Sequence, residues 1–236
     1  MRIIILLIIA INLQAAFPEW FYKIKNSKEK KKAFVKILLP IINEENRKIL
    51  LTRNKIILMF ETKNFDYSFL KKVAKQYKIK NIKSLDEYLI KINTIPPSLA
   101  LAQAAIESGW GNSRFVKSAN NIFGHWEYSD KGVKPKSTYS HIKIKYSLKK
   151  FKSIRDSVKA YMLNLNRNRA YHLFRELRAK YLAQNKLFSG GIAASTLKNY
   201  SQLKTKYVRL IQKIIIANKW QIFDKGNICT NKYGMR

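Results

Sequence analysis

The sequence predicts a mainly α protein that carries one small β-hairpin lobe. Apolar residues recur at helical spacing in most segments of the 236-residue chain. Residues typical of helix N-termini precede several of these segments. Strand-like alternation with a period of two residues marks one short segment, residues 142–146. With 47% hydrophobic residues, the chain is long enough for one globular domain with a helical extension.

The N-terminal part of the chain is expected to form a helical arm. Residues 31–58 have a helical apolar pattern, with Pro40 as an expected kink. Shorter helices are expected over residues 67–77 and 85–92. Ser84 and Glu87 have the spacing of a capping box at the start of the second.

An alanine-rich helix follows and ends on a carboxylate. Pro96 and Pro97 open it, since proline suits the first helical turn, and Gly109 closes it in a left-handed conformation. Glu107 is thus placed in the last turn, where a negative charge opposes the helix dipole at a cost of up to about 1 kcal/mol. Such a glutamate beside Trp110 is a candidate general acid with a raised pKa, although a glutamate at a helix end is usually just solvated.

The second half of the chain continues this pattern around the lobe. Residues 122–150 are expected to form the hairpin lobe, with a turn at residues 130–132 before the strand. Helices are expected from Ser153, capped together with Asp156, and over residues 170–182 and 203–217, with a break at residues 189–191. The tail beyond Trp220 is polar and is expected to be loose.

Two motifs resemble a known family. ALAQAAIESGWGNSRF at residues 100–115 and NNIFG at residues 120–124 closely resemble the glucosaminidase family of peptidoglycan hydrolases. The resemblance implies a lysozyme-like helical domain and Glu107 as the catalytic acid. Residues 31–53 also resemble the N-terminal arm of the bacterial Bax family, in which a helical arm precedes a glucosaminidase domain.

The resulting domain organisation has four parts. We expect a signal peptide over residues 1–16, a helical N-terminal arm over 17–93, a lysozyme-like glucosaminidase domain over 94–220 and a C-terminal tail over 221–236.

Glycoside hydrolysis usually needs a second carboxylate beside the acid. The lobe offers Glu127 and Asp130, and Glu127 is our candidate. Alternatively, the acetamido group of the substrate attacks the anomeric carbon, so that one strong protein acid suffices. Tyr200 resembles a family tyrosine that lines the cleft. A second family tyrosine is replaced by Phe151, as in Bax-type sequences.

Several further residues are candidates for binding the sugar chain. Trp110, Phe123 and Trp126 could stack on sugar rings, although Trp110 and Phe123 could equally be core residues that shape the cleft. Asn121 is a candidate substrate contact, and together with Asn120 it is expected to fix the turn before the lobe.

The charge balance is strongly basic. Lys and Arg number 47 against 14 Asp and Glu, a formal charge of +33. This charge suggests the hypothesis of a nucleic-acid-binding protein. The charges are spread over every segment, however, and no nucleic-acid-binding motif accompanies them, so nucleic acid is not the expected partner. An anionic cell-wall or membrane surface is the expected partner, and a lysine-rich proteome would explain the same composition.

No cofactor and no metal are expected. The single cysteine, Cys229, has no partner for an intramolecular disulfide. The histidines, His125, His141 and His172, lack the spacing of metal ligands.

The first residues indicate export. Met1 and Arg2 precede nine apolar residues, 3–11, and small residues follow at 15 and 16, the layout of a secretory signal peptide. We therefore expect a periplasmic or cell-envelope protein, tethered to the membrane if the segment is retained.

The expected function is cleavage of the β-1,4 bond after N-acetylglucosamine in peptidoglycan glycan strands. The alternatives are a non-catalytic wall-binding or scaffold protein on the same fold and an amidase acting on the peptide stem. The oligomeric state is left open.

Overall fold

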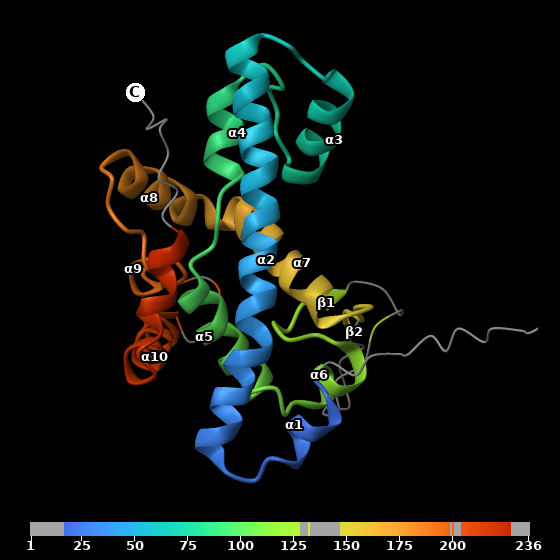
Figure 1. Ribbon diagram of the computed structural model, residues 1–236, viewed down its shortest axis with the longest axis vertical. Helices are drawn as coiled ribbons and strands as arrows, with labels where there is room; N and C mark the ends of the chain where they lie inside the picture. The colour runs from blue at the N-terminus through green and yellow to red at the C-terminus, as the bar shows by residue number, and fades with distance from the viewer. Residues whose placement is uncertain (1–16, 128–131, 133–146, 199, 201–203, 228–236) are drawn as a thin grey trace, which may run out of the picture.

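One long helix organises the molecule. In the computed structural model, which describes residues 17–127, 132, 147–198, 200 and 204–227, helix α2 (Ser27–Thr62) runs most of the length of the protein (Figure 1). Asn26 begins it, accepting hydrogen bonds from the backbone N–H groups of Lys28 and Glu29. Pro40 lies inside this single helix, which extends beyond the predicted range at both ends.

The remaining elements pack around α2. The short helix α1 (Glu19–Lys23) lies at the end where α2 begins, and α3 (Tyr67–Tyr77) lies at the opposite end (Figure 1). The helices and strands that follow are α4 (Leu85–Lys91), α5 (Pro97–Ser108), α6 (Arg114–Ala119), β1 (Trp126–Glu127), β2 (Ser147–Leu148), α7 (Ile154–Arg167), α8 (His172–Ala183), α9 (Gly190–Ala194) and α10 (Lys204–Ala217). Two 3₁₀ helices, η1 (Arg169–Tyr171) and η2 (Trp220–Asn227), complete the described chain.

Helix α5 is the central element. Its small residues, including Ala100, Ala102 and Ala104, are fully buried, which lets α2, α9, α10 and η2 approach it closely. Gly109 ends the helix in the left-handed region, with φ 55°, as predicted. The buried apolar core runs without interruption from the N-terminal arm into this region.

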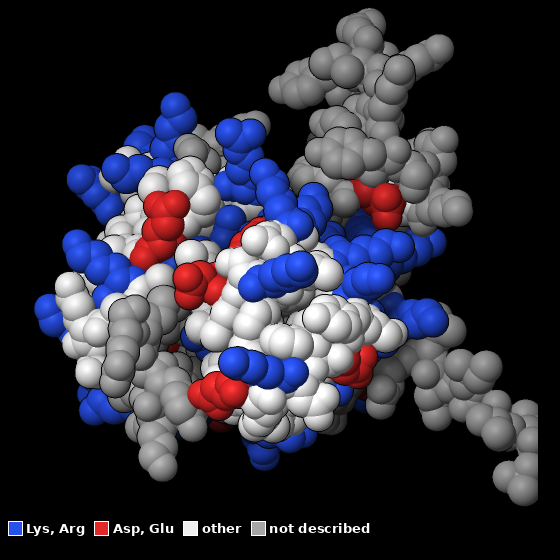
Figure 2. All heavy atoms as spheres, turned by 90° about the horizontal axis from the view of Figure 1, so that it is seen from above, with Lys and Arg blue, Asp and Glu red and all other residues white. Residues whose placement is uncertain are grey.

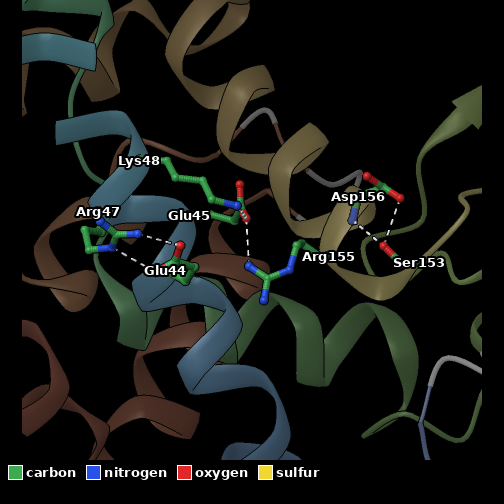
Figure 3. Close-up of polar contacts among 7 residues, drawn as sticks. All are labelled: Glu44, Glu45, Arg47, Lys48, Ser153, Arg155 and Asp156. Carbon is green, nitrogen blue, oxygen red and sulfur yellow. Dashed lines mark hydrogen bonds and ion pairs between the residues drawn. The ribbon is translucent and has the colours of Figure 1, made fainter. Parts of the chain in front are cut away.

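Polar side chains of α2 fix its position on the other helices. The buried Asn46 donates to the carbonyl of Ile95 at 2.8 Å and accepts from the N–H of the same residue at 2.9 Å. The carboxylate of Glu45, which is 4% exposed, forms ion pairs with Arg155 of α7 at 2.9 Å and with Lys48 at 2.8 Å (Figure 3). These contacts fix α2 against the start of α5 and against α7.

The predicted capping residues act as helix N-caps. Ser84 and Ser153 each accept a hydrogen bond from the N–H three residues ahead, in α4 and α7. The hydroxyl of Ser153 also donates to Asp156 at 2.8 Å (Figure 3). Glu87 differs from the capping-box prediction, because its carboxylate accepts from the N–H groups of Lys80 and Asn81 instead.

The expected lobe is present as an antiparallel hairpin. Trp126 pairs with Leu148 and Glu127 with Ser147. The predicted strand over residues 142–146 and the turn at residues 130–131 lie outside the described residues, as do His141, Cys229 and the predicted signal segment. The fold class is therefore confirmed: the protein is mainly α with a small β-hairpin.

The prediction of a loose tail after Trp220 is wrong as far as residue 227, where the chain forms η2. Its buried Asp224 accepts hydrogen bonds from the N–H and the hydroxyl of Ser98 and from the N–H of Gly190. One carboxylate thus satisfies the first N–H groups of both α5 and α9, which sequence spacing could not reveal. None of the described helices is long and apolar enough to cross a membrane.

Candidate active site

Glu107 lies at the C-terminal end of α5 and faces α10. Its Oε1 accepts a hydrogen bond of 2.7 Å from the hydroxyl of Tyr207. Its Oε2 accepts no hydrogen bond from the residues that the structure describes. One carboxyl oxygen is therefore fixed by the protein, and the other is left to meet a ligand.

A chain of hydrogen bonds leads from the interior to this carboxylate. The hydroxyl of Tyr161, on α7, donates to Oε1 of Gln103 at 2.6 Å. Nε2 of Gln103 donates to the hydroxyl of Tyr207 at 3.0 Å, which in turn donates to Glu107. Gln103, Tyr161 and Tyr207 are all buried. Because each polar group has a partner, the chain holds the carboxylate of Glu107 in one orientation.

Aromatic rings pack around this chain. The ring of Tyr200 stacks on Tyr207 with centroids 5.6 Å apart and planes 4° from parallel, and Tyr171 lies 5.9 Å from Tyr200. The ring of Phe123 stacks on Tyr161 at 3.9 Å. Tyr200, the predicted cleft tyrosine, is therefore beside the network that holds Glu107.

The turn before the hairpin passes close to the free oxygen of Glu107. Gly124 has φ 66°, and a Cβ built there would lie 3.6 Å from Oε2. Glycine thus accepts the left-handed backbone and leaves the space beside Oε2 open.

Burial raises the pKa of the Glu107 carboxyl above 4.5, while the hydrogen bond from Tyr207 lowers it; the net shift is upward. The direction agrees with the prediction from sequence. The largest cause of the upward shift is desolvation of the carboxyl group by burial. Burial also raises the pKa of Tyr207, so its hydroxyl stays protonated as a donor near neutral pH.

The second carboxylate candidate lies on the hairpin. Glu127 belongs to β1, and its Oε2 is 4.0 Å from Nζ of Lys149, next to β2. Its side chain is 36% exposed. Asp130 lies outside the described residues, so the role of Glu127 as the second catalytic group stays a prediction.

The predicted sugar-binding aromatics lie in different surroundings. Trp126 is 50% exposed at the start of the hairpin. Phe123 is 3% exposed against Tyr161. Trp110 packs edge-on between Phe34 of α2 and Trp220 of η2, each at 5.6 Å. Of these aromatics, Trp126 has the surface that a sugar ring could cover.

Asn120 and Asn121 fix the turn as expected. The amide of Asn120 donates to the carbonyls of residues 151 and 152. Asn121, 2% exposed, donates to the carbonyls of His125 and Lys149 and accepts from the N–H of His125. These bonds join the turn to both strands of the lobe. A contact of Asn121 with substrate stays a prediction.

Sequence reasoning missed the polar network itself. Tyr161 and Tyr207 lie among apolar residues at helical spacing, as core residues do, and Gln103 lies one helical turn before Glu107 in an alanine-rich helix. A tyrosine or glutamine in a buried stripe needs a polar partner, and this was the available signal.

Comparison with known proteins shows the family of the chain. The family model described as "Mannosyl-glycoprotein endo-beta-N-acetylglucosaminidase", Glucosaminidase, matches residues 83–219. "Protein bax" of Escherichia coli (strain K12) is 33% identical over 187 residues, which cover 75% of this chain and 66% of that protein. This chain thus spans just under two thirds of the relative's length. No solved structure matches the chain significantly.

The family model covers α5 with Glu107, the hairpin, and α7 and α10 with the tyrosines of the network. The chain therefore belongs to the glucosaminidase family, and is similar to Protein bax over most of its length.

Proposed function

We propose that this protein is an exported peptidoglycan hydrolase that cleaves the β-1,4 glycosidic bond after N-acetylglucosamine, with Glu107 as the general acid. The observation that carries the proposal is the state of Glu107. Its pKa is raised by burial, one oxygen is held by Tyr207, and the other is open beside Gly124. A carboxyl group of this kind keeps its proton closer to neutral pH, as a general acid must.

In the proposed reaction the proton of Glu107 passes to the glycosidic oxygen as the bond to the anomeric carbon breaks. Tyr207 then stabilises the carboxylate that forms, because its hydrogen bond is stronger to a charged acceptor. A water molecule supplies the hydroxyl of the new reducing end.

Two routes complete the chemistry. In the first, Glu127 accepts the proton of the attacking water, which inverts the anomeric configuration. In the second, the acetamido oxygen of the substrate attacks the anomeric carbon, and Glu107 then takes the proton from the water that opens the ring intermediate. The first route requires a carboxylate on the hairpin lobe, and Glu127 of β1 supplies one there.

The test is a digest of purified peptidoglycan, followed by reduction and mass spectrometry of the fragments. Reduced N-acetylglucosamine ends are expected from the wild type and are expected to be lost in Glu107→Gln. Glu61→Gln, an exposed glutamate on α2, is the matched control. Reduced or anhydro N-acetylmuramic ends would contradict the proposed bond. New peptide termini would favour the amidase alternative, and wall binding without cleavage would favour the scaffold alternative.

A separate comparison distinguishes the two routes. If Glu127→Gln loses as much activity as Glu107→Gln, the inverting route is supported. If Glu127→Gln retains most activity, substrate assistance is supported. The stereochemistry of the first product, followed by NMR, gives an independent answer because the two routes produce opposite anomers.

A further inference from the structure

A lysine-rimmed groove is lined by none of the residues that hold Glu107 in the candidate active site. It runs between the first turns of α2 and the segment after α10. Lys28, Lys31, Lys32 and Lys36 of α2 form its rim. Residues 28, 32 and 36 are spaced four apart, so their side chains follow one another along one face of the helix over about 12 Å. We call this the lysine groove.

The floor of the lysine groove is apolar. Val35 and Leu39 come from α2, and Trp220 and Phe223 come from η2. Trp220 is buried, whereas Val35, Leu39 and Phe223 are only partly covered. Asn218 contributes the one neutral polar side chain to the described lining. An apolar trough below a row of cations suits a ligand with an apolar body and an anionic head.

Among the described residues, no carboxylate pairs with the lysines of the rim. In the part of the protein that the structure describes, no ion pair involves Lys28, Lys32 or Lys36. Lys31 lies over the ring of Trp110, 4.8 Å from its centre. The buried carboxylate of this region, Asp224, is already bound to Ser98 and Gly190. The charges of the rim are therefore available to an external anion.

Net charge alone would not make this groove special. Figure 2 shows Lys and Arg distributed over the face at the α3 end of the molecule as well. The lysine groove differs because its cations border a concave apolar floor. The proposal therefore depends on this combination, and its test compares the groove with an equally basic surface elsewhere.

We propose that the lysine groove binds an anionic phospholipid, with an acyl chain on the apolar floor and the phosphate headgroup at the lysines. An acyl chain brings no hydrogen-bonding groups to a floor that offers few. An extended peptide would bring N–H and C=O groups that need partners. Clusters of four or more lysines on an amphipathic surface are typical of binding to anionic lipid.

The surroundings of the groove fit a membrane surface. Trp20 of α1 is 50% exposed and lies at the same end of the molecule as the start of α2 (Figure 1). Tryptophan is enriched at membrane–water interfaces because its ring is apolar and its N–H is polar. Phe17, which follows the apolar segment of residues 3–11 in the sequence, packs on Phe21 and Phe34 at this end.

The first test measures the fraction of the protein that sediments with vesicles. Anionic vesicles of phosphatidylglycerol and phosphatidylcholine are compared with vesicles of phosphatidylcholine alone. The variant Lys28→Gln/Lys32→Gln/Lys36→Gln is compared with Lys71→Gln/Lys72→Gln/Lys75→Gln, which removes three exposed lysines from α3 at the far end (Figure 1). At about fivefold per lysine, the groove variant is expected to lose roughly a hundredfold in partitioning to anionic vesicles. Equal losses in both variants would overturn the proposal, because they would indicate a general effect of charge.

The second test asks whether the acyl chain reaches the floor. With Trp20→Phe and Trp126→Phe, the remaining tryptophans are Trp110 and Trp220, which contact each other beside the groove. Lipids brominated on the acyl chain are expected to quench this fluorescence, and Leu39→Gln is expected to weaken the quenching while circular dichroism stays unchanged. No quenching despite vesicle binding would overturn the proposed pose. Binding to polyglutamate as strong as binding to anionic vesicles would also overturn it. So would release of the protein from these vesicles by inorganic phosphate at matched ionic strength.

Discussion

Replacing Glu107 by glutamine is expected to stabilise the protein while removing its activity. The amide keeps the size of the carboxyl group, and its oxygen can still accept the hydrogen bond that Tyr207 donates at 2.7 Å. What disappears is a charge that burial makes unfavourable, as the raised pKa of Glu107 indicates. The variant thus separates the electrostatic cost of this carboxylate from its packing.

The two effects have different magnitudes. Loss of a general acid typically reduces the rate about 10²–10⁴-fold. A single stabilising substitution commonly adds about 0.5–2 kcal/mol of stability. Since Glu107 is only partly buried, we expect about 1 kcal/mol, or a rise in Tm of about 2–4 °C for a protein of this size.

The stability gain should depend on pH with a definite sign. The folded-state pKa of Glu107 lies above the ordinary value of 4.5, so the unfolded chain ionises first as pH rises. Below 4.5 the carboxyl group is neutral in both states, and glutamine gives no charge advantage. The advantage grows as pH rises through the folded-state pKa and is complete near neutral pH.

Urea denaturation measures this effect. It compares Glu107→Gln with the wild type and with the Glu61→Gln control, below pH 4.5 and near neutral pH, alongside the digest of peptidoglycan. A destabilised Glu107→Gln at neutral pH, or a gain of the same size under acidic conditions, would refute the reasoning about burial. Retention of near wild-type turnover would remove Glu107 from the role of acid.

Further substitutions test the surroundings of the site. Tyr207→Phe removes the hydrogen bond that lowers the pKa of Glu107, so the alkaline limb of the pH profile of activity should move to higher pH. The free energy of unfolding should fall by about 1–3 kcal/mol, because Gln103 also loses the acceptor of its hydrogen bond. Burial lowers the pKa of His125 from 6.5 to about 4, so stability should fall by up to about 3 kcal/mol as pH drops through this range, and His125→Phe should flatten that dependence in urea titrations. Gly111→Ala should lower Tm by several degrees, because φ is 80° and the new Cβ would lie 2.9 Å from the ring of Phe17.

The local features of the site could be predicted from neighbouring residues. Gly109 was expected to end α5, and it does so with φ 55°. Ser153 was expected to cap α7, and its hydroxyl accepts from the N–H of Asp156. These predictions succeed because a helix end is governed by side chains within one turn of it.

The outcome for Trp110 illustrates where local reasoning ends. Its position beside Glu107 in the sequence is compatible both with a ring that meets a sugar and with a core residue that shapes the cleft. In the structure its side chain packs between Phe34, 76 positions earlier (110 − 34), and Trp220, 110 positions later (220 − 110). The residue also has φ 56°, a left-handed backbone conformation that is uncommon for a residue other than glycine.

By itself, the sequence determined the mainly α fold, the hairpin, the ends of α5 and the placement of Glu107 in its last turn. Each of these follows from apolar periodicity or from side chains that act within a few residues. The tertiary structure alone decided what surrounds Glu107. Gln103 meets Tyr161 and Tyr207 across separations of 58 and 104 residues. Such contacts depend on how helices pack, which no local pattern encodes, and they set the burial that raises the pKa of the proposed acid.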